Sequence, residues 1–182
     1  MNYKEKQIFL TDNIPCTLGS PKEEDAEEML LYFKLASEES NFMINYPEEI
    51  TMTVDEEKEF LKKSLESETD IRIAAFIGEK IVGSATIYSY SSQMKMKHRA
   101  CFGIAIREKF QGKGLGNILT KEAIDMAKQL GYEQVELGVF ADNHKARSLY
   151  RKYGFEEWGC VKNAFRLKDG TYRDEITMGL IL

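Results

Sequence analysis

The chain has 182 residues, a length typical of one domain, and 43% of them are hydrophobic, which is enough to form a buried core. Its formal net charge of −5 argues against a general nucleic-acid-binding protein, because such a protein needs a basic face that displaces counterions. Residues 1–10 lack the long apolar run of a signal peptide, and no segment reaches membrane-spanning length, so we expect a cytoplasmic protein with no membrane partner.

The first third of the chain predicts short strands and then helices. Apolar residues at Ile8–Leu10 and Cys16–Leu18 predict one or two strands. The segment Ser20-Pro21-x-Glu23 predicts a helix start, with Ser20 as the N-cap, Pro21 in the first helical position and Glu23 completing a capping box.

A second capping box, Thr53-x-x-Glu56, predicts another helix, whose apolar face includes Phe60, Leu61 and Leu65. The stretch between the two helices, residues 37–52, is irregular.

From Asp70 onward the hydrophobic period changes to that of strands. The predicted elements that follow are a hairpin at Ile71–Ile77 and Ile81–Tyr88, a strand at Arg99–Ile106, a long helix from Leu115 to Leu130, a strand at Val135–Val139, a shorter helix at Asp142–Tyr153, and a strand pair at Glu157–Phe165 and Tyr172–Leu180. This order predicts an α/β (α+β) fold with a mixed, largely antiparallel sheet flanked by helices, in a single domain over residues 1–182.

The three cysteines, Cys16, Cys101 and Cys160, are widely spaced, and neither His98 nor His144 lies near a cysteine cluster. We therefore expect reduced, mostly buried thiols and no metal site.

The most informative segment is Gln111-Gly112-Lys113-Gly114-Leu115-Gly116, between a predicted strand and a long helix. Glycines let the backbone approach a ligand closely, and the free N–H groups at a helix start favour phosphate oxygens. Lys113 adds positive charge there. The glycines also fit a plain reading, in which they only permit a tight strand-to-helix turn.

Two common phosphate-binding motifs are missing from this segment. The nucleotide P-loop requires GxxxxGK[ST], and the dinucleotide fingerprint requires GxGxxG, whereas Gly112, Gly114 and Gly116 form GxGxG. A nucleotide-binding domain is therefore the weaker alternative.

The segment resembles the pyrophosphate loop of the GNAT superfamily of acyl-CoA N-acetyltransferases, which reads (Gln/Arg)-x-x-Gly-x-(Gly/Ala). The resemblance implies that backbone amides of residues 111–116 bind the pyrophosphate of acetyl-CoA. It also implies that the preceding strand, at Ile104, Ala105 and Ile106, opens through a bulge and pairs with the pantetheine arm. Gly103 is a plausible bulge residue on physical grounds as well, and the resemblance predicts a sheet that is splayed at its central strands.

A second segment, residues 141–155, is similar to the family's Asn-x-x-Ala-x-x-Leu-Tyr-x-Lys-x-Gly-Phe pattern. The resemblance implies that Asn143 contacts the CoA arm and that Tyr150 protonates the departing thiolate. Asn143 and Tyr150 are seven residues apart and so share a helix face. A phenol stays protonated at neutral pH, which suits an acid. The plain alternatives are a core aromatic for Tyr150 and a helix cap for Asn143.

The resemblance implies direct transfer of an acetyl group from acetyl-CoA to a primary amine, either a small molecule or a protein N-terminus, without a metal. Backbone N–H groups near Ile104 are candidates for stabilising the oxyanion. Glu38, Glu39 and His98 are candidate bases, although a solvated surface role fits each of them better. The acceptor site is expected from Glu38–Tyr46 and residues 165–174.

An alternative from another class is a CoA-binding regulatory module without acceptor turnover, against which Tyr150 counts. Homodimers are common in the family, and the sequence leaves the oligomeric state open.

Overall fold

The computed structural model describes the backbone of residues 1–182 and every side chain except that of Asp12. The strands are β1 (Lys6–Leu10), β2 (Ile14–Gly19), β3 (Ile71–Ile77), β4 (Lys80–Ser89), β5 (Arg99–Ile106), β6 (Gln134–Phe140), β7 (Glu156–Arg166) and β8 (Tyr172–Ile181). The α-helices are α1 (Ala26–Glu39), α2 (Val54–Glu66), α3 (Leu115–Gln129) and α4 (His144–Lys152).

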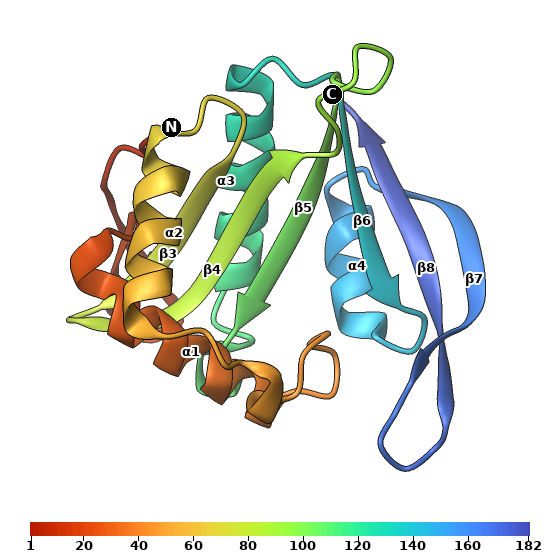
Figure 1. The fold of residues 1–182 in the computed structure, drawn as a ribbon, viewed down its shortest axis with the longest axis horizontal. Coiled ribbons are helices and arrows are strands. Elements are labelled where there is room, and N and C mark those ends of the chain that lie inside the picture. Colours follow the sequence, from red (N-terminus) through yellow and green to blue (C-terminus); the bar gives the residue numbers. More distant parts are fainter.

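All eight strands form one sheet in the order β1-β2-β3-β4-β5-β6-β8-β7. Neighbouring strands are antiparallel except for β5 and β6, which are parallel. In Figure 1, β5 and β6 lie side by side at one end and separate toward the other. The predicted mixed, largely antiparallel sheet, flanked by helices and splayed at its central strands, is confirmed.

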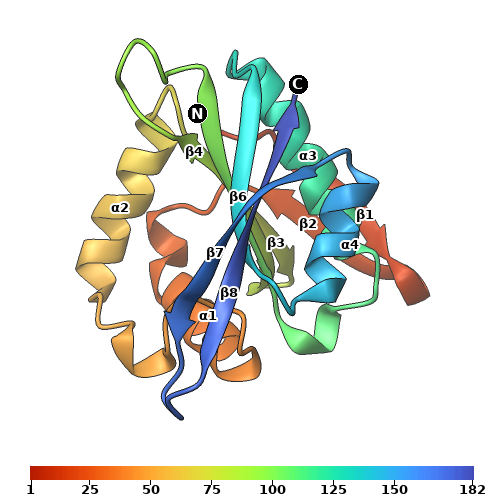
Figure 2. The same ribbon diagram turned by 90° about the vertical axis from the view of Figure 1, so that its right-hand side faces the viewer.

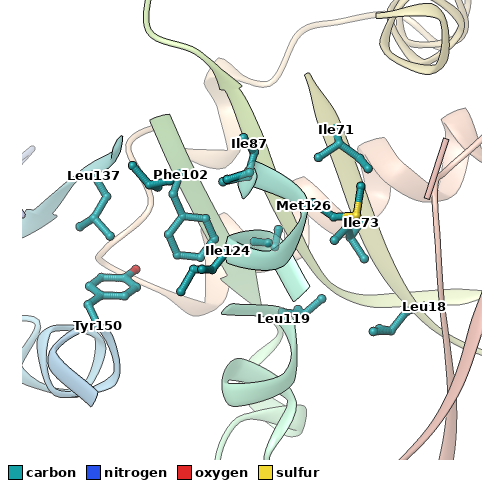
Figure 3. Packing of buried hydrophobic residues seen from close by; sticks show 14 of the residues in the cluster. Leu18, Ile71, Ile73, Ile87, Phe102, Leu119, Ile124, Met126, Leu137 and Tyr150 are labelled. Atoms are coloured by element: carbon teal, nitrogen blue, oxygen red, sulfur yellow. The ribbon is translucent and has the colours of Figure 1, made fainter. Parts of the chain in front are cut away.

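Helices cover both faces of the sheet. Figure 2 shows α1 and α2 on one face and α3 and α4 on the other. Alternate residues of a strand point to opposite faces, so each strand contributes to both layers. Beneath α3 lies the larger core, where Ile73, Ile87 and Phe102 from three strands gather around Leu119 and Met126 (Figure 3).

A smaller core lies under α1. Met29 and Tyr32 on α1 are fully buried against Ala74 and Ile81. The Tyr32 hydroxyl donates a 2.8 Å hydrogen bond to the carbonyl oxygen of Ala105, which fixes α1 to β5.

The two predicted helix starts have different outcomes. Thr53 caps α2 as expected: its Oγ1 accepts from Glu56 N, and Thr53 N donates to the Glu56 carboxylate. The prediction for Ser20 is wrong, because its hydroxyl accepts from Tyr3 N and donates to the carbonyl oxygen of Arg72. Hydrogen bonds to residues distant in the chain therefore use the hydroxyl group that the local sequence pattern predicts as a helix cap.

The cysteine prediction is correct in part. All three thiols are free, and Cys16 is buried, but Cys101 is half-buried and Cys160 is exposed. Cys160 lies on β7, the edge strand of the sheet, where the side chains are mostly exposed.

Across the part of the chain that the structure describes, no helix is long and apolar enough to span a membrane.

Candidate functional site

A cleft of about 1760 Å³ opens where β5 and β6 separate. Its walls come from α1, the α1–α2 connection and α2 on one side, and from β6, α4 and the ends of β7 and β8 on the other. Its base is formed by the glycine-rich segment before α3. Most of the residues that the sequence singles out therefore surround one cavity.

The separation of β5 and β6 is the feature that creates the cleft. The two strands pair only at Arg99–Gln134, Ala100–Val135 and Cys101–Glu136. Residues 102–106 of β5 then continue without a described β6 partner, so one edge of this strand faces the cleft. Ile104, Ala105 and Ile106, the predicted pantetheine-binding residues, all line it.

The prediction of a bulge at Gly103 is wrong. The pairing of β4 with β5 runs without a register shift from Gly83–Ile106 to Ser89–Ala100. The register shift in this part of the sheet lies between β3 and β4, where Ala75 pairs with Gly83 and Phe76 with Ile81, which leaves Val82 on β4 as the extra residue. The strand opens by losing its β6 partner, not by inserting a residue.

Gly103 has another role at this point. A Cβ atom on it would meet no atom within 4 Å, and it lies two residues beyond the last paired residue of β5. Gly138 occupies the equivalent position on β6, and both glycines line the cleft. Neither strand therefore carries a side chain on its backbone at this point of the opening.

The glycine-rich segment forms a backbone cradle. Gly112 and Gly114 have φ values of +75° and +87°, which L side chains rarely adopt, and the space where a Cβ would sit is empty at both. Gly116 serves packing instead, because a Cβ there would lie 3.2 Å from Leu149 and 3.4 Å from Ile106. The glycines therefore do permit a tight strand-to-helix turn, as the simpler interpretation of the sequence expects. In addition, the empty space beside Gly112 and Gly114 opens into the cleft.

Side chains fix this segment in place. Gln111 Nε2 donates to the carbonyl oxygen of Ile106, and its Oε1 accepts from Lys145 Nζ on α4. The carbonyl oxygen of Lys113 accepts from Thr11 N, and Leu115 is buried in the core. Gln111 thus connects the glycine-rich segment to β5 and to α4. Because the Leu115 side chain is in the core, only its backbone is available to a ligand in the cleft.

The face of α4 that points to the cleft carries both predicted residues, Asn143 and Tyr150. Asn143 is also the N-cap of α4, since its Oδ1 accepts from Ala146 N at 3.1 Å. One acceptor site of the side-chain oxygen is therefore used in the cap, while no described residue bonds to the amide nitrogen.

Tyr150 combines a buried ring with a hydroxyl directed at the opening. Its ring packs edge-to-face on Phe102, with centroids 6.0 Å apart, and against Phe155 at 5.9 Å. Figure 3 shows the hydroxyl pointing toward the strands, between Leu137 on β6 and Phe102 on β5. Burial raises the pKa of Tyr150 to about 12, so the phenol is neutral at physiological pH.

The base candidates from sequence are poorly placed. Glu39 accepts bonds from Arg107 Nε and Nη2 and from Glu108 N, and the Arg107 guanidinium holds the pKa of that carboxyl below its usual range. Glu38 is exposed on α1, and His98 immediately precedes the end of β5 that stays paired with β6. None of these three residues therefore places a free basic group at the opening between β5 and β6.

Glu175 on β8 is a cleft residue that sequence reasoning missed. It pairs in register with Phe140, and its carboxylate lies against the bare backbone of Gly138. No local motif marks it, because the pairing of β6 with β8 brings it to the site.

The predicted acceptor segments do meet. Phe140 stacks on Phe165 with ring centroids 4.0 Å apart, and Phe42 from the α1–α2 connection packs edge-on against Phe140 at 5.8 Å. Tyr46 accepts a bond from Lys168 N in the β7–β8 turn. The α1–α2 connection and the β7–β8 hairpin therefore close one end of the cleft.

Among the described side chains, no group of three or more His, Cys, Asp or Glu residues is arranged to hold a metal ion.

Comparison with known proteins agrees with this geometry. Residues 32–155 match the model of the acetyltransferase (GNAT) family, and the chain belongs to this family. It is 33% identical over 111 residues to the L-amino acid N-acetyltransferase AaaT of Escherichia coli, an alignment that covers 60% of this chain and 67% of that protein.

Two solved structures are also similar. A GNAT-family acetyltransferase from Streptococcus pneumoniae has a TM-score of 0.87 and 27% identity, over 92% of this chain and 99% of that one. A GNAT phosphinothricin acetyltransferase from Sinorhizobium meliloti, solved in complex with AcCoA, shares the fold with a TM-score of 0.78 and 18% identity, over 92% and 88% of the two chains. The prediction of an N-acetyltransferase of the GNAT family is confirmed.

Proposed function

We propose that residues 1–182 act as one catalytic domain, which binds acetyl-CoA along β5 and the glycine-rich segment and transfers its acetyl group directly to a primary amine. The observation that carries the proposal is the meeting of three parts in one cleft: the cradle at residues 111–116, the unpaired edge of β5, and the hydroxyl of Tyr150. A site that only bound CoA would not need a neutral phenol at the opening.

The cradle fits a pyrophosphate. Gly112 and Gly114 leave free space beside the backbone, and α3 begins directly afterward with the uncharged turn Leu115-Gly116-Asn117. The N–H groups and dipole of a 15-residue helix favour an anion at this end. The unpaired edge of β5 offers backbone donors and acceptors to the amide groups of the pantetheine arm, with the Asn143 amide nitrogen opposite.

Acetyl-CoA supplies an acetyl group activated as a thioester. The acceptor nitrogen forms a bond to the carbonyl carbon, and the C–S bond breaks with its electron pair on sulfur. Tyr150 donates its proton to that sulfur, and Glu175 accepts the proton that the amine loses. Solvent then restores both groups, so the enzyme ends unchanged. Holding both reactants in one cleft supplies much of the acceleration.

Gly114→Ala tests the cofactor half, with Gly131→Ala as a matched control. Both glycines have positive φ, +87° and +82°, and open space around the Cβ position, so the backbone strain is similar. Only Gly114 lies on the cleft. A ligand that binds the native state alone stabilises it by about 2.7 kcal/mol at a concentration of 100 Kd. We expect acetyl-CoA to raise the Tm of wild type and Gly131→Ala, and to raise that of Gly114→Ala much less.

Release of free thiol in the presence of an amine panel tests the transfer half. Thiol release that depends on both acetyl-CoA and an amine supports the enzyme. A Tm shift with acetyl-CoA but no amine-dependent release would favour the CoA-binding module, and absence of any shift in wild type would overturn the cofactor assignment.

A further inference from the structure

A second cavity of about 420 Å³, the side cavity, adjoins the acceptor end of the cleft. It lies between the end of α1, the α1–α2 connection and the β7–β8 hairpin. Six residues line both the side cavity and the cleft: Ser40, Asn41, Met43, Ile44, Phe140 and Phe165. The two spaces are therefore adjacent, and a molecule bound in the cleft can extend one end toward the side cavity.

The wall that the two spaces share is uncharged and mostly apolar. None of its six residues is ionisable, and Phe140 and Phe165 stack with ring centroids 4.0 Å apart. Phe42, which lines the cleft and packs edge-on against Phe140, is 42% exposed, and Ile44 is 78% exposed. Exposed apolar side chains that gather beside a cavity are typical of a ligand-binding site.

The proposed transfer places the acceptor nitrogen close to this wall. Glu175 pairs in register with Phe140, and its carboxylate reaches back over Gly138. Two residues of a strand span about 7 Å, so Phe140 lies about 7 Å beyond Gly138 along β6. A nitrogen beside the Glu175 carboxylate therefore has the opening on one side and the aromatic wall on the other. The substituent that points away from the thioester runs toward the wall.

Contacts between the α1–α2 connection and the hairpin close the far end of the side cavity. The backbone N–H of Lys168 donates a 3.0 Å hydrogen bond to the hydroxyl oxygen of Tyr46. The Lys168 ammonium lies 4.0 Å from the centre of the Tyr46 ring and forms an ion pair with Glu48. Tyr46 and Lys168 both line the side cavity. In this direction there is therefore room for the end of a small molecule and no exit for a continuing chain.

We propose that the acceptor carries an aryl group that packs against Phe42 and Phe165 and projects into the side cavity, so that the preferred substrates are small arylalkylamines. This rests on the proposed acetyl transfer. A short alkyl arm, as in 2-phenylethylamine, joins the amine at Glu175 to a ring at the wall, across the distance of about 7 Å between Gly138 and Phe140. A polyamine fits less well, because its second ammonium would lose water against an uncharged wall.

A series of amines tests the proposal directly. The acceptors are ethylamine, 2-phenylethylamine and 1,4-diaminobutane at saturating acetyl-CoA, with thiol release expressed per concentration of neutral amine. We expect kcat/KM for 2-phenylethylamine to exceed that for ethylamine by about 10- to 100-fold, because the aryl group leaves water for an apolar site. The diamine should be no better than ethylamine.

Phe42→Ala and Phe60→Ala form a matched pair of variants. Both rings line the cleft and are similarly exposed, at 42% and 43%, but Phe60 lies on α2 and does not line the side cavity. Phe42→Ala should raise the KM for 2-phenylethylamine about 10-fold and leave the kinetics with ethylamine and the KM for acetyl-CoA unchanged. Phe60→Ala should keep the preference of wild type, and equal loss of that preference in the two variants would contradict the proposal.

Phe165→Leu serves as a second variant that protects the fold. It keeps an apolar side chain beside Phe140 and removes only the ring, on an edge strand where residue 165 is partly buried. We expect the preference for 2-phenylethylamine over ethylamine to fall about 3- to 10-fold, the scale of a contact between aromatic rings. The Tm of each variant, measured without ligand, shows whether the fold is kept.

A binding measurement keeps the test independent of turnover. N-(2-phenylethyl)acetamide, the expected product, is titrated into the enzyme with CoA, and should bind at least about 10-fold more weakly to Phe42→Ala than to wild type. Ethylamine acetylated as efficiently as 2-phenylethylamine, or an aryl preference that survives in both Phe42→Ala and Phe165→Leu, would overturn the proposal while leaving acetyl transfer in place. No acetylation of any amine would refute the proposed function. The titration alone would then decide on the aryl site, which binding that does not depend on Phe42 would overturn.

Discussion

The side chain of Glu175 on β8 lies across Gly138 on β6, so closely that a Cβ atom on residue 138 would overlap its carboxylate. Glu175 pairs in register with Phe140, so its side chain reaches along β6 toward the point where β5 and β6 separate. Gly138 provides the room for it. A glycine on one strand thus places a carboxylate from another at the mouth of the cleft.

Glu175→Gln should lower kcat with a primary amine by about 100-fold at neutral pH, because general base catalysis is typically worth 10²–10⁴. The KM for acetyl-CoA should not change. Since a neutral amine needs no base, the variant should regain rate as the pH approaches the pKa of the acceptor amine. The measurement is thiol release from pH 6 to pH 10.

Glu136→Gln is the control for this variant. Glu136 lies on the same face of the sheet, but its carboxylate is already bound by Arg99 through Nε and Nη2. Loss of this ion pair in Glu136→Gln should lower the Tm and leave kcat unchanged. A Glu175→Gln enzyme with wild-type kcat at neutral pH would remove Glu175 from the mechanism.

Gly138→Ala should displace Glu175 and cost about 1–3 kcal/mol of unfolding free energy, the usual range for overpacking. Activity with amines should fall with it, because the carboxylate moves from the opening. Gly103→Ala is the matched variant on β5, where a Cβ meets no atom within 4 Å. Gly103→Ala should keep the unfolding free energy of wild type. If chemical unfolding shows the same loss of unfolding free energy for both variants, displacing the Glu175 side chain does not destabilise the protein.

The positions of the elements could be predicted from the sequence, because the hydrophobic period of each strand and helix is a local property. The strand predicted at Arg99–Ile106 matches β5 at both ends, and Thr53 caps α2 as its spacing requires. The glycine-rich segment and the helix with Asn143 and Tyr150 could also be predicted from the sequence, because each is a short contiguous motif.

What could not be predicted depends on partners distant in the chain. Ser20 has the sequence of a helix cap, yet its hydroxyl is bonded to Tyr3 N, near the start of the chain, and to the carbonyl oxygen of Arg72 on β3. Gly103 is a glycine in a strand, and only its register with β4 shows that it forms no bulge. Glu175 has no motif around it, and its place at the opening follows only from the pairing of β6 with β8.

Glu39→Gln distinguishes a structural ion pair from a catalytic base. Glu39 is bound by Arg107 Nε at 2.9 Å and Nη2 at 2.7 Å, and by Glu108 N at 2.8 Å. We expect a loss of about 1–3 kcal/mol in unfolding free energy, typical of hydrogen bonds to a charged group, and kcat within about 3-fold of wild type.

The stability effect of Glu39→Gln should depend on pH. Because Arg107 lowers the pKa of the Glu39 carboxyl in the native state, its stabilisation is present above the unfolded pKa, near 4.5, and is lost as the pH falls through the lowered native value. The difference in Tm between wild type and variant should therefore shrink below about pH 4. A 100-fold loss of kcat at neutral pH would restore Glu39 as a candidate base.

Tyr150→Phe should lower kcat by about 100-fold, the scale of general acid catalysis, and leave the free energy of unfolding within about 0.5 kcal/mol of wild type. The ring contacts with Phe102 and Phe155 are kept, and the structure describes no protein hydrogen bond to the hydroxyl that would be lost. Tyr132→Phe is the matched control, because its hydroxyl donates to the carbonyl oxygen of Thr69 at 2.8 Å. It should lose about 1 kcal/mol of stability and keep its kcat.

The pH profile of kcat tests the same residue in another way. Burial raises the pKa of Tyr150 to about 12, so the phenol stays protonated and able to donate until the pH rises through that value. Wild type should therefore show no alkaline loss of kcat from Tyr150 up to about pH 10, the ordinary tyrosine value. An alkaline limb near pH 10 that disappears in Tyr150→Phe would mean that the hydroxyl is solvated rather than buried, because solvent contact would return its pKa to that of a free phenol.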